Sequence, residues 1–489
     1  MLQRSLGHYE RFSLARHNVG HAPSVAFTAQ IASRDALVIS ALDAAIRSLL
    51  LTEPLLSSSI ADSRTEDPKY LRHSDVRSEK VLVELDTLGE STEQALLGGI
   101  QAMNDLDIEK APLWRVFVYQ PQPETRKRRI VVATHHVLCD GSAARNLFVE
   151  LLTLFREPPS TSELVPDPLF PPTLEETVNV KPSKWLTLRT IFSVFIAPRI
   201  PSFLYTRPLR CWPNPALVAP INQPTALRAF SLPRDLSLAL ATISKTHDVK
   251  TLQPVFITAA TSAIANVVLR RQSDPTSPSP PILIASQSPV SLRSPSLGHI
   301  SSLTGNYISS ISHSNPPLSL SILSTTSFWS SARSYSEFSK LPSTQQLAKE
   351  GMGLLGYLPS GLSTDDTSTG GRTPTMWEKH LYEQMEKDPN PWRGESFEVS
   401  NLGRIGEVKG WEGGGVEEVC WAQPGSGTGI GVIFNMVSFG GVLSWTVTWR
   451  KDTIDTDTVE EIAGAFETIL TRIAKGEVGK DTKLDELLT

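Results

Sequence analysis

The sequence predicts a mixed α/β fold divided into two domains, and three observations support this prediction. The chain has 489 residues, which is more than one ordinary hydrophobic core organises. Runs rich in β-branched residues alternate with runs whose apolar residues recur at helical spacing. A proline-rich stretch separates two such sets. We therefore expect an N-terminal domain over residues 1–155, a crossover linker over 156–225 and a C-terminal domain over 226–489.

The first set opens with a helix expected over residues 33–51, where Leu42, Ile46 and Leu49 fall on one face. Strand-like runs of Val, Ile and aromatic residues follow it and alternate with further helical patterns. The elements expected next are a strand over 81–85, a helix over 92–103, paired strands over 114–119 and 130–135, and a helix that ends at Phe155 before Pro158 and Pro159.

The second set repeats this mixture after the proline-rich stretch. Its expected elements are a strand over 227–232, helices over 233–247 and 252–269, a strand over 282–284, hairpin strands over 429–437 and 442–449, and a helix over 458–474. Residues 273–281 are expected to form a loop, and residues 363–374, which hold Gly, Ser, Thr and Asp, are the best candidate for a mobile loop.

Composition excludes some classes of protein. Forty-six basic and 51 acidic residues give a net charge of −5, so there is no basic excess that would favour nucleic acid as a partner. The three cysteines, Cys139, Cys211 and Cys420, are too few and too far apart for a disulfide framework. They fit a reducing compartment, and we expect a cytoplasmic protein.

Membrane-related signals are weak. No apolar signal-peptide core lies near the N-terminus, and no stretch of about 18 apolar residues predicts a spanning helix. Residues 185–205 are apolar with a few arginines. They either rest on a membrane or lipid-droplet surface or pack as the crossover between the two domains, and the crossover is favoured.

The most informative segment is residues 135–141, which read His-His-Val-Leu-Cys-Asp-Gly. The β-branched run over 130–134 predicts a buried strand before it, and the pattern of Leu and Phe after it predicts a helix. The histidines therefore lie where a buried strand ends, a place that is rigid but open to a cleft. Imidazole can accept and return a proton near neutral pH, so this segment is a candidate for general-base chemistry.

Less specific interpretations compete with this one. A single histidine at a strand end is usually structural. Two histidines and an aspartate can hold a metal ion, but adjacent strand residues point to opposite faces, and no further His/Cys cluster completes such a site. Cys139 is either a nucleophile or a small buried packing residue, and the second interpretation is favoured.

The pattern of His135, His136, Asp140 and Gly141 resembles the HHxxxDG motif of the CoA-dependent acyltransferases, which include chloramphenicol acetyltransferase, plant acyltransferases and peptide-synthetase condensation domains. Residues 111–118 resemble the strand that pairs with the motif strand in that superfamily. Four further segments resemble fungal alcohol acetyltransferases, namely the opening over 4–16, Ser291-Leu292-Arg293, Gly305-Asn306-Tyr307 and the SNxG segment within 397–403. By these residues the chain is identified as similar to the fungal alcohol acetyltransferase family over most of its length.

The resemblance implies two chloramphenicol-acetyltransferase-like α/β sandwich domains with a tunnel at their interface. Acyl-CoA would enter from one side and a small alcohol or amine from the other. Acetyl-CoA is implied as a co-substrate, no tightly bound cofactor or metal is expected, and a monomer is expected. Ester formation in the cytoplasm, with peripheral contact to the endoplasmic reticulum or lipid droplets, would fit this family.

The resemblance also implies roles for individual residues. His136 matches the catalytic base, and Asp140 matches a structural aspartate that pairs with an arginine, for which Arg293 is our candidate. The tight turn is expected to need Gly141 because glycine permits a backbone conformation that a side chain would forbid. His135 is more structural than catalytic. The residues expected along the tunnel are His135, Gly141, Arg293, Asn306, Ser400 and Asn401; the last two either line it and donate to the oxyanion, or form a turn in which Asn401 bonds its own backbone.

One segment departs from the plant branch, whose DFGWG motif has only Ser438-Phe439-Gly440-Gly441 as a counterpart here. Three alternatives to alcohol acetylation remain open. The acceptor could be a long-chain amine, because His136 could deprotonate either nucleophile. The acyl donor could be a carrier protein, as in a condensation enzyme. The chain could also be a binding module without catalysis.

Overall fold

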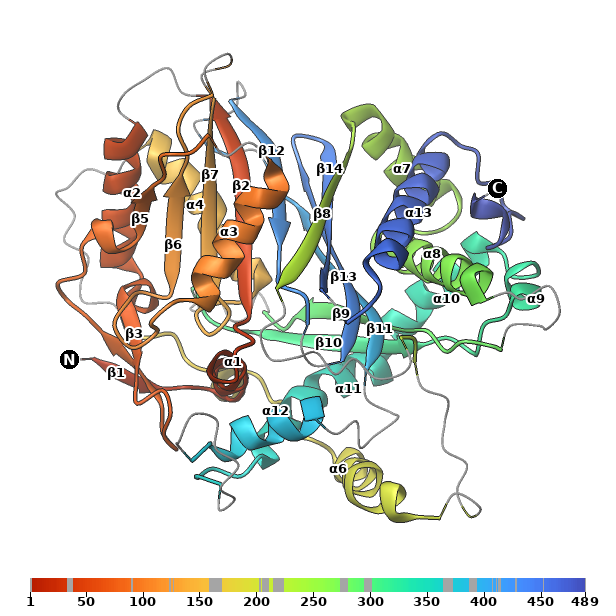
Figure 1. Cartoon of the computed structure of the whole chain (residues 1–489), viewed down its shortest axis with the longest axis horizontal. Coiled ribbons are helices and arrows are strands. Elements are labelled where there is room, and N and C mark those ends of the chain that lie inside the picture. Colours follow the sequence, from red (N-terminus) through yellow and green to blue (C-terminus); the bar gives the residue numbers. More distant parts are fainter. Residues whose placement is uncertain are drawn as a thin grey trace.

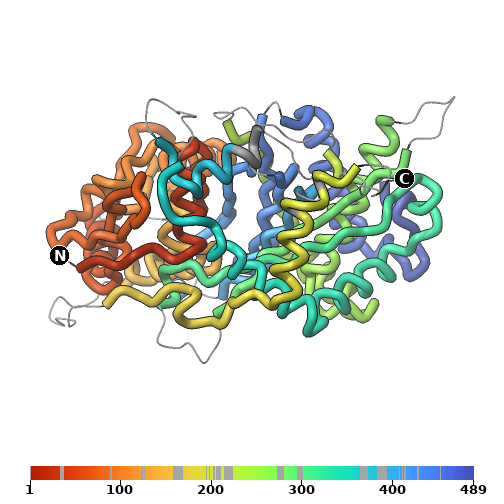
Figure 2. The backbone as a smooth tube through the Cα atoms, turned by 90° about the horizontal axis from the view of Figure 1, so that it is seen from below, coloured from red at the N-terminus to blue at the C-terminus, as the bar shows by residue number. Residues whose placement is uncertain are grey.

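The computed structural model describes the chain from residue 2 to residue 488 with gaps. The residues outside the description are 33–37, 89–90, 123–124, 126, 158–168, 202–203, 205–210, 214–223, 273–279, 294–300, 364–372, 387–393, 407, 410, 412–414, 427–428 and 452, and of 194, 198 and 383–386 only the backbone is described. Two layered bodies lie side by side along the long axis, with the two termini at opposite ends (Figures 1 and 2).

The first body is built on a five-stranded sheet in the order β12-β2-β7-β6-β5. Its strands are β2 Ser24–Ala32, β5 Leu82–Glu84, β6 Trp114–Val118, β7 Lys127–His135 and β12 Val416–Ala422, and its helices are α2 Val38–Thr52, α3 Thr92–Asn104 and α4 Gly141–Arg156. Successive strand residues point to opposite faces. Accordingly, the methyl group of Ala26 lies against Gly99 of α3, whereas Phe27 stacks on Phe148 of α4 at 5.1 Å. Helices therefore cover both faces of the sheet.

The second body is built on a six-stranded sheet in the order β10-β9-β11-β13-β14-β8. Its strands are β8 Thr225–Leu232, β9 Ala285–Ser291, β10 Ile308–Ser314, β11 Glu395–Arg404, β13 Ile430–Phe439 and β14 Val442–Arg450, and its main helices are α7 Arg234–Thr246, α8 Gln253–Gln272, α10 Phe328–Lys340 and α13 Thr456–Ala474. Phe434 and Trp445 of the sheet pack on Phe466 of α13, with ring centroids 4.6 and 5.9 Å apart. The other face of this sheet turns towards the first body.

A strand from the second half of the chain completes the first sheet. β12 pairs antiparallel with β2, in the register Trp421 to Phe27 and Ala422 to Ala26 (Figure 1). The indole of Trp421 then donates to the carbonyl of Met436 on β13 at 3.0 Å. β12 is thus bonded to both bodies. The bounds 1–155, 156–225 and 226–489 remain a prediction about how the chain divides.

Smaller elements surround the two sheets. A three-stranded sheet in the order β1-β4-β3 lies beside the N-terminal helix α1, and a group of helices underlies both bodies (Figure 1). Their bounds are β1 Gln3–Ser5, α1 His8–Asn18, β3 Ser58–Ala61, β4 Lys69–Arg72, α5 Leu174–Thr177, α6 Lys184–Ile191, α9 Leu320–Leu323, α11 Pro342–Gly353 and α12 Met376–Glu386. Short 3-10 turns cover Pro54–Ser57, Ser78–Lys80, Ala197–Arg199, Leu354–Tyr357 and Glu486–Leu488, and one π-helical turn covers Phe192–Ile196.

Helix α6, in the segment that follows the first body, lies at the lower edge of the molecule (Figure 1). Large apolar side chains on it are exposed, among them Trp185 at 72% and Leu188 at 63%. In the described part of the chain, no helix is both long enough and apolar enough to cross a membrane.

The structure has the expected helices and most of the expected strands, with bounds shifted by one to three residues where both ends are described. One expectation was wrong. Residues 282–284 do not form a strand, because Ile282 and Leu283 make only isolated bridges, and the regular strand β9 begins at Ala285. Most of the loops expected over 273–281 and 363–374 lie outside the described residues, as do Pro158 and Pro159.

Candidate active site

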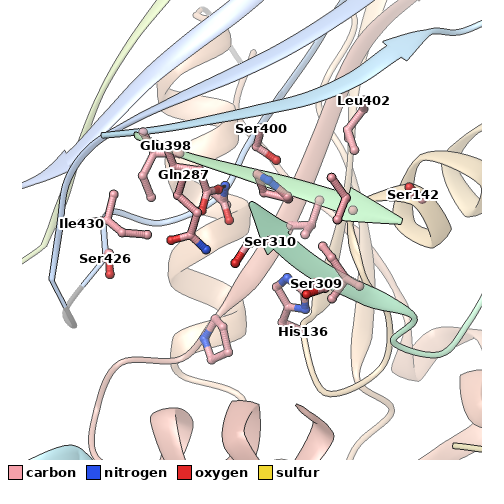
Figure 3. A pocket seen from close by; sticks show the side chains of 18 of the residues that line it. His136, Ser142, Gln287, Ser309, Ser310, Glu398, Ser400, Leu402, Ser426 and Ile430 are labelled. Carbon is pink, nitrogen blue, oxygen red and sulfur yellow. Dashed lines mark hydrogen bonds between the residues drawn. The ribbon is translucent and has the colours of Figure 1, made fainter. Parts of the chain in front are cut away.

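A cavity of about 500 Å³ lies where the two bodies meet, and it has His136 in its wall. The loop after β7 supplies His136, α1 supplies Tyr9 and Arg16, and the start of α4 supplies Gly141 and Ser142. The second sheet supplies residues of β9, β10, β11 and β13, and its labelled residues surround the cavity in Figure 3. Elements far apart in the sequence therefore build one site.

The hydrogen bonds of Asn306 determine which nitrogen of His136 carries a proton. The amide nitrogen of Asn306 donates to the carbonyls of His136 and Val137, at 2.9 and 2.8 Å. Because carbonyls only accept, this orientation leaves Oδ1 of Asn306 facing Nδ1 of His136 at 3.2 Å. Nδ1 must therefore be the protonated nitrogen, and Nε2 keeps its lone pair. Within the described residues, Nε2 has no hydrogen-bond partner.

The surroundings of His136 favour the neutral imidazole. Burial lowers its pKa below the usual 6.5, and the nearby guanidinium of Arg16 lowers it further, whereas Asp140 and Asn306 raise it. The ring of Tyr9 packs edge-on against the imidazole, with centroids 5.4 Å apart. Because the lowered pKa keeps the imidazole unprotonated at neutral pH, His136 can act as a base there.

Asp140 fastens the His136 loop to the segment that carries Asn306. One carboxylate oxygen caps α4 by accepting from the N–H of Ala143 at 3.0 Å. The other accepts from the N–H of Tyr307 at 2.9 Å and from the guanidinium of Arg293. Arg293 also donates to the carbonyl of Gly305 at 2.9 Å. The expected contact between Asp140 and Arg293 is present, and neither residue lines the cavity.

His135 and Cys139 point away from the cavity. Nδ1 of His135 accepts from the N–H of Val137 at 3.1 Å, so Nε2 carries the proton and lies 3.2 Å from Nδ1 of His17. Burial holds the pKa of His135 well below its usual value. Cys139 is fully buried in the first core, and burial raises its pKa to about 12. A thiol in that state is not a nucleophile at neutral pH, so the packing interpretation applies.

Gly141 is needed for a different reason from the one expected. Its φ angle is not in the left-handed region, because it is the first residue of α4. A β-carbon there would instead lie 3.0 Å from Cδ2 of Leu402 on β11. The conformational argument was therefore wrong, and the close approach of α4 to β11 is the reason for glycine.

Ser400 and Asn401 both lie in the wall of the cavity. Asn401 also accepts from the N–H of Gly403 at 2.9 Å, as the turn interpretation expects. Three of the residues expected along a tunnel are absent from the cavity wall. These are His135, Arg293 and Asn306, which lie behind the wall and hold the loop that carries His136.

Several residues of the cavity were missed by the sequence argument. They are Tyr9 and Arg16 from α1, Gln287 from β9, and Glu395, Glu398 and Gln423 from the second half of the chain. One of them had a usable signal. In residues 397–400, Phe-Glu-Val-Ser, apolar and polar residues alternate; Phe397 and Val399 lie in the second core and Glu398 and Ser400 face the cavity. Since Ser400 was a candidate, its strand neighbour on the same face could have been named too.

Within the described residues, no group of three or more His, Cys, Asp and Glu side chains is placed to hold a metal ion.

Comparison with known proteins gives one match by sequence pattern and many by structure. A family model described as alcohol acetyltransferase matches residues 75–179, a range that includes His136 and Asp140. No curated protein matches the chain by sequence.

Solved structures share the fold of the whole chain at low identity. One is the TRI3 trichothecene 15-O-acetyltransferase from Fusarium sporotrichioides, with a TM-score of 0.61 and 12% identity over 96% of this chain and 94% of that one. Another is polyketide synthase associated protein 5 from Mycobacterium tuberculosis, with a TM-score of 0.59 and 13% identity over 97% and 98%. A third is the epimerization domain from the third module of tyrocidine synthetase B, with a TM-score of 0.58 and 13% identity over 99% and 98%. The chain thus has the chloramphenicol-acetyltransferase-like α/β fold of these proteins, built from two layered bodies.

Proposed function

We propose that this chain is an acyl-CoA-dependent O-acyltransferase that moves an acetyl group from acetyl-CoA to an alcohol, with His136 as general base. The observation that carries the proposal is the fixed tautomer of His136. Its Nε2 lone pair is free in the wall of a cavity between two bodies, and Asn306 holds the proton on Nδ1. The match of residues 75–179 to the alcohol acetyltransferase model supports the same class of reaction.

The proposed reaction needs no covalent intermediate on the enzyme. Nε2 of His136 takes the proton from the acceptor hydroxyl, and the hydroxyl oxygen attacks the thioester carbonyl carbon at the same time. The carbonyl electron pair moves to oxygen and forms a tetrahedral oxyanion. When that intermediate collapses, the carbon–sulfur bond breaks, and the imidazolium returns its proton to the departing thiolate. The products are an acetate ester and free CoA.

Ser400 is proposed to lie along the path of the reacting groups. It shares the cavity wall with His136, and its hydroxyl can donate a hydrogen bond to a developing oxyanion. Asp140 is proposed as the structural support of the site, acting through the segment 305–307 rather than on the substrate.

The test follows the release of free thiol from acetyl-CoA with a panel of alcohols and amines. The His136→Ala variant is expected to lose acceptor-dependent release by roughly 10²- to 10⁴-fold, the usual contribution of a general base. His313→Ala is a matched control, because His313 is a partly buried histidine on β10 that does not line the cavity. It should keep its activity.

Each other result has a definite meaning. Full activity in His136→Ala would reject His136 as the base. A preference for amines would assign N-transfer, and release from an acylated carrier protein but not from acetyl-CoA would assign a condensation-type donor. No release with any donor would favour a binding module.

Peripheral contact of the segment around α6 with the endoplasmic reticulum or lipid droplets is also proposed. Trp185, Leu188, Ile191 and Phe195 are each between 44% and 72% exposed, and residues 178–200 contain cations but no acidic residue. Such a face suits an anionic lipid surface.

Flotation with vesicles of phosphatidylcholine and phosphatidylserine tests this contact. The full chain should float with the anionic vesicles, and the Leu188→Glu/Phe195→Glu variant should not. Leu238→Glu is the control, because Leu238 is 55% exposed but lies on α7. If the unaltered chain stays unbound, the lipid contact is rejected.

A further inference from the structure

We propose that the acceptor carries a second polar group, remote from the reacting hydroxyl, and that Glu398 binds this group as a hydrogen-bond acceptor. The proposal rests on the acyl transfer proposed above and narrows its acceptor. It assigns a bifunctional acceptor, such as a diol or an amino alcohol, in place of a simple alcohol with a hydrocarbon chain.

The strand β11 positions Glu398 in the wall of the cavity. On β11 it pairs in register with Gln287 of β9 and Ile433 of β13, so its backbone is held on both sides. Only 6% of the residue is exposed, and it lines the cavity together with His136. In Figure 3 it lies beside Gln287, on the side of the cavity away from Ser142. A molecule with one group at His136 can therefore reach Glu398 with another.

The carboxyl group of Glu398 has few partners of its own. Its Oε1 accepts from the amide of Gln423 at 2.6 Å. Within the described residues, it has no ion-pair partner, and no hydrogen bond to its second oxygen is found. A buried carboxylate with an unfilled lone pair is costly, and a donor group on a ligand would offset that cost.

Its electrostatic surroundings decide when Glu398 is a carboxylate. Burial raises the pKa of Glu398 to about 7, and the neighbouring Glu395 raises it as well, whereas Gln423 and Arg16 lower it. Glu395 also lines the cavity and is hydrogen-bonded by Ser312 at 2.8 Å. Above this pKa of about 7, Glu398 is a carboxylate, which only accepts, so it then favours a ligand that donates hydrogen bonds.

The rest of the cavity wall is mixed. Hydroxyl and amide side chains, among them Gln287, Ser310 and Gln423, alternate with apolar ones such as Ile430, Ile433 and Trp421. A second polar group on the acceptor would therefore find hydrogen-bond partners that a slot lined wholly by apolar side chains would not offer. Arg16 lies close enough to Glu398 to lower its pKa, so the wall holds charges of both signs. The carboxyl oxygen can accept a hydrogen bond from either a hydroxyl or an ammonium group.

The test compares acceptors of equal length that differ only at the far end. A series of 1-alkanols, α,ω-diols and ω-amino alcohols is used with acetyl-CoA at pH 8, above the pKa of Glu398, and thiol release gives kcat/KM. At the best spacer length, the unaltered chain should prefer a bifunctional acceptor by at least about 10-fold, as one good hydrogen bond to a charged group allows. The preference should appear mainly in the KM for the acceptor, since Glu398 takes no part in the proton transfer.

Two variants assign that preference to Glu398. Glu398→Leu should remove it for both kinds of second group. Glu398→Gln should remove it for the amino alcohol and retain part of it for the diol, because an amide oxygen still accepts from a hydroxyl. Glu53→Gln is the matched control, since Glu53 is a half-buried glutamate bonded to Ser301 outside the cavity. It should leave the preference unchanged.

Failure of this inference differs from failure of the proposed function. Equal kcat/KM for simple and bifunctional acceptors in the unaltered chain would overturn the role of Glu398, while acyl transfer would stand. A preference that survives in Glu398→Leu would overturn it as well. Absence of thiol release with every acceptor would overturn the acyl transfer itself and the inference with it.

Discussion

The proton of His136 is placed by Asn306, a residue 170 positions further along the chain. If Asn306 is replaced by Leu, the carbonyl of His136 loses the donor that Asn306 supplies, the carbonyl of Val137 keeps only the hydroxyl of Tyr70, and Nδ1 of His136 loses its acceptor. The imidazole can then adopt the other tautomer, in which Nε2 carries the proton and cannot act as a base. We expect kcat to fall by about 10²-fold with a smaller change in KM. Steady-state kinetics on the purified variant would measure this.

A comparison of the single and double variants separates positioning from folding. If Asn306 acts only through His136, Asn306→Leu should cause little further loss in a His136→Ala background. An equal loss in both backgrounds would contradict the positioning role.

Asp140 is expected to matter for stability as well as for activity. The Asp140→Asn variant keeps an oxygen that can cap α4, but it leaves the guanidinium of Arg293 opposite a neutral group. Breaking a buried ion pair on one side commonly costs about 3 kcal/mol of unfolding free energy. Urea unfolding of Asp140→Asn would measure that loss. Adding Arg293→Met should restore part of the lost unfolding free energy, because no unpaired cation then remains. If nothing is restored, the broken ion pair is not the cause of the loss.

At the scale of elements, α4 approaches β11 closely near the site. A β-carbon at Gly141 would lie 3.0 Å from Leu402, so Gly141→Ala should lower the unfolding free energy by about 1 kcal/mol through overpacking. In a Leu402→Ala background, the same change should be neutral or slightly stabilising, because alanine favours the helix over glycine. Thermal unfolding of the four proteins would show the change of sign. A loss of equal size in both backgrounds would mean that Leu402 is not the obstacle.

Elements with a local pattern were predictable from sequence, and elements defined by distant partners were not. The amphipathic helix α13 was expected over 458–474 and is Thr456–Ala474. The hairpin of β13 and β14 was expected from Gly440 and Gly441, and both have the positive φ angles, 58° and 87°, that a tight two-residue turn requires. In contrast, the parallel pairing of β11 with β9 and β13 leaves no local signature, because it joins segments separated by long stretches of chain.

The residues of the candidate site also divide into those that a local sequence pattern reveals and those that it does not. His136, Asp140 and Arg293 could be named because two of them belong to a contiguous motif and the third to a recognisable segment. Tyr9 and Arg16 reach the cavity from α1 and Glu398 reaches it from β11, and each is an ordinary polar residue in its own stretch of sequence. Only the fold brings them to one wall.

At the scale of the whole molecule, buried histidines make stability depend on pH. Burial lowers the pKa of His17 to about 4 and that of His21 to about 3, from 6.5 in an unfolded chain. Between these values the unfolded chain binds more protons than the folded one. This contribution to stability is therefore fully present above pH 6.5 and is lost as the pH falls towards 4.

Urea unfolding between pH 7 and pH 4.5 would measure this dependence. The unaltered chain should lose unfolding free energy across that range, and His17→Gln should lose less, since one group that binds protons only when unfolded is gone. An unchanged slope in His17→Gln would show that His17 is not among the groups responsible.

The strand β12 also has a consequence for how the protein is made. On a ribosome, the segments of the first sheet emerge early, but the outer edge of β2 stays open until residues 416–422 have been translated. An open strand edge invites pairing with other nascent chains. The first body is therefore exposed to misassembly until β12 has left the ribosome, and it reaches its final form only after that strand has paired with β2.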